Sequence, residues 1–169
     1  DGGYSPWAIP TGLHAEMKLL CRQRSFIVNE LSNAKRRLTS LLDLSFPEFA
    51  EHFSDSYGKA PLAVLRQAPT AKDLLGMPIK ELSQLLRKNS GGHHGEAMAK
   101  KLRAAARKSI ALSQDSEALA SSIVLLIEQL AFFNQQILDC DKQIETTFEQ
   151  LDDPIEAIPG VGAKTGPII

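Results

Sequence analysis

Two stretches of this chain repeat apolar residues every 3.5 positions, and this repeat constrains the fold more than any other feature. In the first stretch the apolar positions alternate in steps of four and three, with Arg24 as the one break. They are Leu13, Met17, Leu20, Ile27, Leu31, Ala34, Leu38 and Leu41. A 3.5-residue repeat sustained over several heptads is typical of a coiled-coil helix. No Pro or Gly interrupts residues 13–44, so we predict a first long helix over that range, ended by Phe46-Pro47.

The second stretch follows the same rule near the other end of the chain. Its seam positions are Leu119, Ile123, Leu126, Leu130, Phe133, Ile137, Cys140, Ile144, Thr147 and Leu151. Asp115 and Ser116 offer an N-cap, and Pro154 ends the pattern. We therefore predict a second long helix over residues 115–153.

The two predicted helices carry opposite charge. Residues 13–42 hold six Lys or Arg against two Glu, whereas residues 117–153 hold eight Asp or Glu against one Lys. Exposed ion pairs are each worth only ~0.2–1 kcal/mol, so such charges select partners more than they stabilise. Opposite charge and matching seams favour an antiparallel pair within one chain, and they equally allow pairing between chains in a homo-oligomer.

Between the long helices, residues 45–114 read as a cluster of short helices. Phe46, Phe49 and Phe53 share one apolar stripe, and Thr70 to Asp73 is a capping pattern. A Gly-Gly loop over residues 89–95 precedes a basic, Ala-rich helix predicted from Glu96 to Leu112. No segment alternates with period two, so no sheet is expected.

The predicted fold is therefore all-α, a long antiparallel coiled-coil hairpin with a small inserted helical cluster and a C-terminal helix-hairpin-helix-like turn. It divides into five segments: an extended lead-in (1–12), the first long helix (13–44), the inserted cluster (45–114), the second long helix (115–153) and the start of a further domain (154–169).

Composition indicates the kind of cellular compartment in which the protein works. The 169 residues carry a net charge of −1, and the only two cysteines, Cys21 and Cys140, fit a reducing compartment. No uninterrupted apolar run reaches ~18 residues, so we expect neither a membrane partner nor a signal peptide. Because the chain starts at Asp1 and stops at Ile169 within a motif, we expect it to be a piece of a longer protein.

The tail contains the first candidate site. It reads Ile-Pro-Gly-Val-Gly-Ala-Lys-Thr over residues 158–165, the hairpin pattern of helix-hairpin-helix DNA-binding modules. Gly160 and Gly162 allow a tight turn whose N–H groups point at a phosphate, and Lys164 and Thr165 add a charge and a hydroxyl. Such contacts read the nucleic-acid backbone and not the bases. The alternative is a Gly-rich turn that only closes two helices, and Gly166-Pro167 depart from the pattern.

A basic helix is the second candidate. Residues 87–108 carry a net charge of +6. Most of the positive charge is on Lys100, Lys101, Arg103, Arg107 and Lys108. On a helix Lys100, Arg103 and Arg107 share one face, and Lys101 and Lys108 another. A face this basic in a near-neutral chain suggests contact with a nucleic-acid backbone. A solvated face, or a surface for an acidic partner, is the alternative.

Catalytic and metal-binding patterns are missing from the sequence. His93 and His94 next to Glu96 lack a third ligand at useful spacing, so a solvated loop is expected and no metal site. No Ser-His-Asp order, P-loop or spaced pair of carboxylates is present, so we assign no catalytic residue.

The order of these features resembles the middle of bacterial insertion-sequence transposases of the "one-ten" family, also called the one-one-six / one-ten / nine-oh-two group. The resemblance rests on a basic heptad helix, a Phe-Pro-Glu-Phe turn at residues 46–49, a Pro-Thr-x-x-Asp-Leu helix at 69–74, the Gly-Gly loop, the basic Ala-rich helix and an acidic heptad helix. The most specific element is Ile-Pro-Gly-Val-Gly at residues 158–162, which also occurs in repair and recombination proteins.

This resemblance implies a bacterial, cytoplasmic and nucleoid-associated DNA recombinase. Members have an N-terminal RNase H-like domain with four catalytic acids, a coiled-coil region and a C-terminal domain with a nucleophilic serine, and some are guided by an RNA. Neither the acids nor the serine motif lies in residues 1–169, so the resemblance implies no catalysis and no cofactor here. A divalent metal such as magnesium would belong to the parent protein. Gly160, Gly162, Lys164 and Thr165 match the family's hairpin as a nucleic-acid contact.

We therefore interpret the chain as the assembly and nucleic-acid-positioning region of an insertion-sequence transposase, with DNA, a guide RNA and further copies of itself as partners. Two alternatives stay open. One is a non-enzymatic coiled-coil scaffold for protein partners. The other is a helix-hairpin-helix module of a DNA repair or recombination factor.

Overall fold

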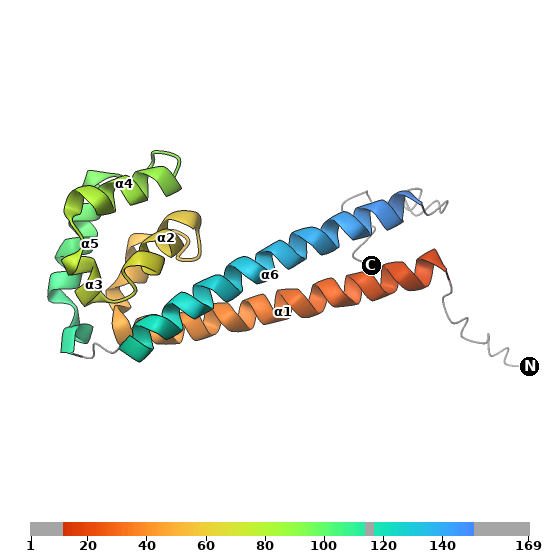
Figure 1. Cartoon of the computed structure of the whole chain (residues 1–169), viewed down its shortest axis with the longest axis horizontal. Coiled ribbons are helices and arrows are strands. Elements are labelled where there is room, and N and C mark those ends of the chain that lie inside the picture. The colour runs from red at the N-terminus through yellow and green to blue at the C-terminus, as the bar shows by residue number, and fades with distance from the viewer. Residues whose placement is uncertain (1–11, 114–116, 151–169) are drawn as a thin grey trace, which may run out of the picture. The chain divides into compact units, whose positions relative to one another are not determined.

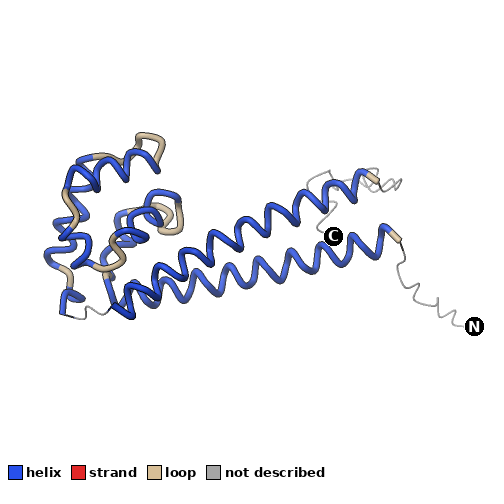
Figure 2. The backbone as a smooth tube through the Cα atoms, in the orientation of Figure 1, coloured by secondary structure: helices blue, strands red, loops and turns tan. Residues whose placement is uncertain are grey.

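The computed structural model describes residues 12–113 and 117–150, and in these ranges it is helical without a strand (Figures 1 and 2). The all-α prediction is thus confirmed for the described part of the chain. The elements in order are α1 (Leu13–Ser45), the 3₁₀ helix η1 (Pro47–His52), α2 (Lys59–Gln67), α3 (Ala71–Gly76), α4 (Ile79–Asn89), α5 (Glu96–Lys108), the 3₁₀ helix η2 (Ile110–Ser113) and α6 (Glu117–Glu149).

The chain forms two compact units, and both long helices contribute to each. Among the described residues, the first unit combines residues 12–31 with residues 132–150, and the second consists of residues 32–113 and 117–131. The five segments predicted from the sequence begin and end where helices begin and end, whereas the two units are defined by which residues pack together. The division into five segments stays a prediction. The predicted N-cap at Asp115 and Ser116, and the stop at Pro154, lie outside the described residues.

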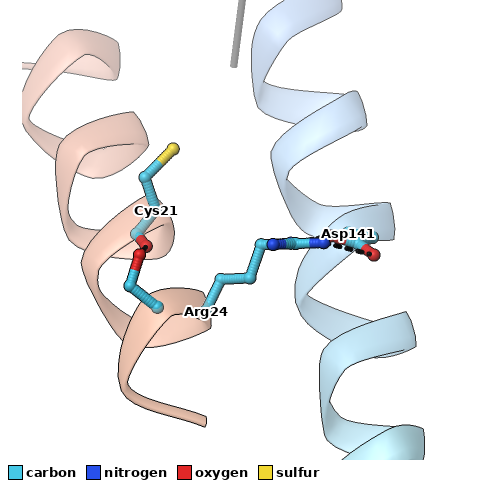
Figure 3. A network of polar contacts seen from close by, with 4 residues as sticks. Cys21, Arg24 and Asp141 are labelled. Carbon is cyan, nitrogen blue, oxygen red and sulfur yellow. Dashed lines mark hydrogen bonds and ion pairs between the residues drawn. The ribbon is translucent and has the colours of Figure 1, made fainter. Parts of the chain in front are cut away.

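In the first unit a charged contact joins the two long helices. The Arg24 guanidinium of α1 forms an ion pair with the Asp141 carboxylate of α6, both side chains being half-buried (Figure 3). A hydrogen bond from this guanidinium lowers the free energy of its protonated form, which raises the pKa of Arg24. Arg24 is the break in the first apolar seam, so the break coincides with a polar contact between helices. The heptad packing of a coiled coil stays a prediction.

Apolar seam residues near this ion pair are buried on both helices. Ile27 and Leu31 on α1 are at most 9% exposed, as are Cys140 and Ile144 on α6. A charged pair among apolar neighbours is worth little in stability. A slip of α6 by one heptad, however, would bring Asn134 or Phe148 to the place of Asp141 and take this partner from Arg24. The ion pair therefore favours this alignment of the two helix segments over slipped ones.

Pro47 sets the end of α1. Phe46 precedes this proline and adopts φ −166° and ψ 72°, outside the helical region, as expected for a residue before proline. Phe46 is fully buried and packs, with the two rings tilted, against Phe49 at 5.6 Å between ring centroids. The Phe49 ring in turn lies 5.1 Å from that of Phe53. The three phenylalanines thus line up along η1, as the sequence predicts.

The core of the second unit consists mainly of aliphatic side chains from the short helices. Contacts join α2 to α4, α4 to α5, α3 to α5, and η1 to α5. The residues that are fully buried here include Leu38, Phe46, Phe49, Val64, Leu65, Leu74, Leu82, Leu86, Ala99, Leu102 and Ala106. Each helix buries one stripe, so its remaining face stays in solvent.

Tyr57 attaches the loop before α2 to α1. Its hydroxyl donates to the Lys35 carbonyl oxygen at 3.2 Å, and the Lys35 ammonium lies 5.1 Å from the centre of the Tyr57 ring. This aromatic side chain is therefore already engaged by its own chain.

The predicted helix from Glu96 to Leu112 is too long. In the structure α5 ends at Lys108, Ser109 is extended, and η2 follows. The Ser109 hydroxyl accepts a hydrogen bond from the Ala111 N–H at 3.3 Å, and the Glu48 carboxylate accepts one from the Ile110 N–H at 3.3 Å. Serine competes with helical backbone bonds in this way, and the Glu48 contact depends on tertiary structure.

Helix α6 is the one described helix that is long and apolar enough, by length and composition, to cross a membrane. An 18-residue window in it reaches a mean hydropathy of 1.3. The sequence analysis looked for an uninterrupted apolar run and so did not single this helix out. Leu125, Phe132 and Leu138 contribute to its hydropathy and are more than half exposed. The expectation of no membrane partner stays a prediction.

The capping box of α3 provides a first prediction. The Thr70 hydroxyl accepts from the Asp73 N–H at 3.1 Å, and the Asp73 carboxylate accepts from the Thr70 N–H at 3.2 Å. We expect Thr70→Ala to lower the free energy of unfolding by about 0.5–2 kcal/mol, because the helix loses its cap. Urea unfolding followed by circular dichroism measures this, with exposed Ser122→Ala as the near-neutral control.

Candidate nucleic-acid interface

The basic residues predicted to contact nucleic acid lie on α5, whose apolar stripe fixes its orientation. Ala99, Leu102 and Ala106 are completely buried against the second unit. These positions are three and four residues apart, so they share one face of the helix. The opposite face therefore points into solvent.

Four of the five predicted basic residues of α5 lie on this solvent side. Lys100, Lys101, Arg107 and Lys108 are all exposed. Among the described residues, no hydrogen bond or ion pair is found for Lys101, Arg107 or Lys108. Their charges are thus available to an external anion.

Arg103 differs from the other four. It is half-buried, and its guanidinium donates to the carbonyl oxygens of Leu75 at 3.1 Å and Met77 at 3.3 Å. These carbonyls lie at and just beyond the end of α3, where a helix leaves its last acceptors unpaired and a cation is favoured. Of the three positions that the sequence analysis placed on one face of the helix, Lys100 and Arg107 are exposed, whereas the side chain of Arg103 turns toward α3. A contact of Arg103 with nucleic acid stays a prediction.

Lys100 has a partner on its own helix. Its ammonium lies 2.8 Å from the Glu96 carboxylate, one turn earlier, and both side chains are about two-thirds exposed. The hydrogen bond and charge of Lys100 hold the pKa of the Glu96 carboxyl below its usual value. Such an exposed pair is weak, so a phosphate can compete with Glu96 for Lys100.

The positive charge extends beyond α5 to the whole segment of short helices. Residues 59–113 contain eleven Lys or Arg against three Asp or Glu, a net charge of +8 in a chain of −1. The same residues include no Phe, Tyr or Trp. The imidazole rings of His93 and His94 lie in the loop before α5, and α5 itself has no aromatic ring. A basic helix face without such rings suits a phosphate backbone better than unstacked bases.

Two alanines complete the exposed face of α5, and the sequence analysis missed them. Ala97 and Ala104 are exposed. Each lies three residues before one cation and four before the next, so each sits between two cations on the helix surface. This repeat is visible in the sequence, but only the burial of the opposite face shows that it is on the outside.

The hairpin residues Gly160, Gly162, Lys164 and Thr165 lie outside the described residues. Their role as a phosphate contact stays a prediction.

His94 and the two cysteines contact or lie among other residues of their own chain. His94 packs edge-on against Phe53, 5.7 Å between ring centroids, and its N–H donates to the Ser90 hydroxyl at 2.8 Å. Cys140 is buried, and burial raises the pKa of Cys21 more than nearby Arg24 lowers it. Within residues 12–113 and 117–150, no three His, Cys, Asp or Glu side chains are grouped to hold a metal ion.

Comparison with known proteins gives one informative match. The chain is 26% identical over 165 residues to the "Insertion element IS116 uncharacterized 44.8 kDa protein" of Streptomyces clavuligerus. The match covers 96% of this chain and 41% of that protein, so the chain spans less than half of its relative's length. No protein-family model matches the chain, and no solved structure gives a significant match. The chain is thus similar, over nearly its whole length, to part of a protein that an insertion element encodes.

The contacts of Arg103 lead to a second prediction. We expect Arg103→Gln to lower the free energy of unfolding by about 1.5–3 kcal/mol, because charge-assisted hydrogen bonds to two carbonyls are lost. Lys at this position should recover only part of the loss, since a single ammonium does not reproduce the planar fork. Thermal and urea unfolding measure the effect. Arg107→Gln, which removes an exposed cation from the same helix, should change stability by less than about 0.5 kcal/mol.

Proposed function

We propose that this chain is the assembly and nucleic-acid-positioning region of an insertion-sequence transposase, and that it binds a nucleic-acid backbone through α5. The observation that carries the proposal is the row of four exposed cations on α5, opposite its fully buried stripe. The similarity to an insertion-element protein over nearly the whole chain supports the biological setting.

Charge distribution favours this function over a protein scaffold. A scaffold needs no net charge of +8 concentrated in residues 59–113 of a chain that is −1 overall. Concentrated positive charge attracts polyanions and accelerates their association. No step of strand chemistry is assigned to these residues, because no catalytic constellation has been identified in them.

Removal of two cations tests the binding function. We expect the double variant Lys101→Gln with Lys108→Gln to bind a fluorescent nucleic-acid duplex at least about tenfold more weakly at 100 mM salt, with a log–log salt slope shallower by about 1 to 2. Fluorescence anisotropy over a salt series measures both quantities.

The matched control is Lys18→Gln with Arg22→Gln, which removes the same charge from exposed positions of α1. It should leave affinity nearly unchanged. Equal losses in both double variants would indicate a general charge effect and refute a site on α5. Lys164→Gln measures the separate contribution of the predicted hairpin.

For assembly, we propose that the occupant of the exposed apolar positions in the first unit is a second copy of this chain. Leu19 and Phe26 lie seven residues apart on α1 and are 67% and 61% exposed. Phe132 and Leu138 on α6 are 58% and 55% exposed. A second copy offers an acidic α6 to the basic α1, so charge complementarity accompanies burial of these side chains.

A charged substitution at Phe26 on α1 tests self-association. We expect the native chain to be a dimer or larger by light scattering across a dilution series. Phe26→Glu should raise the dissociation constant of self-association by at least about tenfold, because a carboxylate would be buried in the contact. Gln23→Glu, at an exposed polar position one turn earlier, is the control. A native chain that stays monomeric at all concentrations would rule out this part of the proposal.

A further inference from the structure

The exposed face of α5 has a regular two-column layout, and the inference drawn from it rests on the proposed function. Lys100 and Arg107 form one column, and Lys101 and Lys108 form the other. Within a column the residues are seven positions apart, which is two turns and about 10.5 Å along the helix. Adjacent positions differ by about 100° around the axis, so the columns flank the strip between them.

Ala97 and Ala104 occupy that strip. Both are exposed, and they are the smallest side chains that a helix can present without losing helix propensity. A surface that meets the strip can approach the helix backbone closely, while the long Lys and Arg side chains extend to either side of it. The face is thus low in the middle and positively charged along both edges.

We propose that α5 lies in the major groove of B-form DNA, with the two cation columns on the phosphates of the two opposite strands. An α-helix with its side chains is about 10–12 Å across, and the B-DNA major groove is about 12 Å wide. In this arrangement Ala97 and Ala104 face the groove floor. One column reaches each wall of the groove.

Other nucleic acids fit this face less well. The major groove of A-form RNA is deep and narrow, so a helix of this width does not enter it. Single strands are usually held by bases stacked on aromatic rings, and α5 itself carries no such ring in residues 96–108. The preferred ligand is therefore duplex DNA.

Low sequence selectivity follows from the same face. Alanine offers the base edges only a methyl group, which contacts the thymine methyl and makes no hydrogen bond. The cations contact phosphates, which are the same in every sequence. Glu96 lies beside the Lys100 column and repels phosphate, so it weakens binding.

The test compares ligands of matched length and sequence with the full chain. Anisotropy titrations use a 20-base-pair DNA duplex, the corresponding RNA duplex and the single DNA strand. We expect the affinity for the DNA duplex to be at least about tenfold higher than for the other two ligands, because only its major groove is wide enough for a helix. Methyl green, which occupies the major groove, should displace the protein, whereas netropsin, which occupies the minor groove, should not.

Variants on the face separate groove entry from charge. Ala104→Leu keeps the charge but raises the floor-facing strip, so affinity for duplex DNA should fall by roughly three- to tenfold. Ala118→Leu, at an exposed position of α6, is the matched control and should bind normally. Glu96→Gln should bind more tightly, by about two- to fivefold, because a negative charge is removed.

The outcomes distinguish this inference from the function it rests on. Absence of binding to all three ligands refutes the proposed function itself. Equal or tighter binding to the RNA duplex or single strand, with the double lysine variant still defective, keeps the function and overturns the groove placement. Displacement by netropsin but not by methyl green, or normal binding by Ala104→Leu, overturns it as well.

Discussion

Burial of one stripe of α5 is the interaction on which the candidate interface depends. Ala99, Leu102 and Ala106 are fully enclosed where α5 meets η1, α3 and α4. A helix rotated by one residue would place a lysine in this apolar core at a large desolvation cost. Packing therefore determines which side chains face solvent. The exposed set is four cations around two alanines, with Glu96 at the start of the helix. The hydrogen bonds of Arg103 also hold α5 in this orientation, because they join α5 to the end of α3.

The two units use charge in different ways. In the first, Arg24 and Asp141 neutralise each other between helices, so the charges contribute to alignment more than to external binding. In the second, the cations of residues 59–113 outnumber their acidic neighbours, and most of those on α5 stay exposed. The net charge of −1 for the whole chain hides this separation, which is why composition alone does not indicate a polyanion ligand.

Local signals in the sequence predicted much of the fold. Phe46-Pro47 marked the end of α1, and Thr70 with Asp73 marked the cap of α3, because proline stereochemistry and capping bonds act over a few residues. The sequence analysis placed the end of α5 at Leu112, beyond its actual end at Lys108. Ser109 competes with the helix locally, but the stop is supported by Glu48, which is distant in sequence and was not recognisable as a partner. For the candidate site, the sequence identified all five cations of α5 but not their separate roles.

Sequence alone determined the helical class, the spacing of the apolar stripes and the concentration of positive charge, since each is a property of neighbouring residues and of helical periodicity. Only tertiary structure decided that Arg103 bonds to the end of α3 while Lys101, Arg107 and Lys108 stay exposed. It also decided that the seam break at Arg24 is matched by Asp141, 117 residues away. Such pairings depend on which surfaces meet when apolar side chains are buried, and no local pattern encodes the partner.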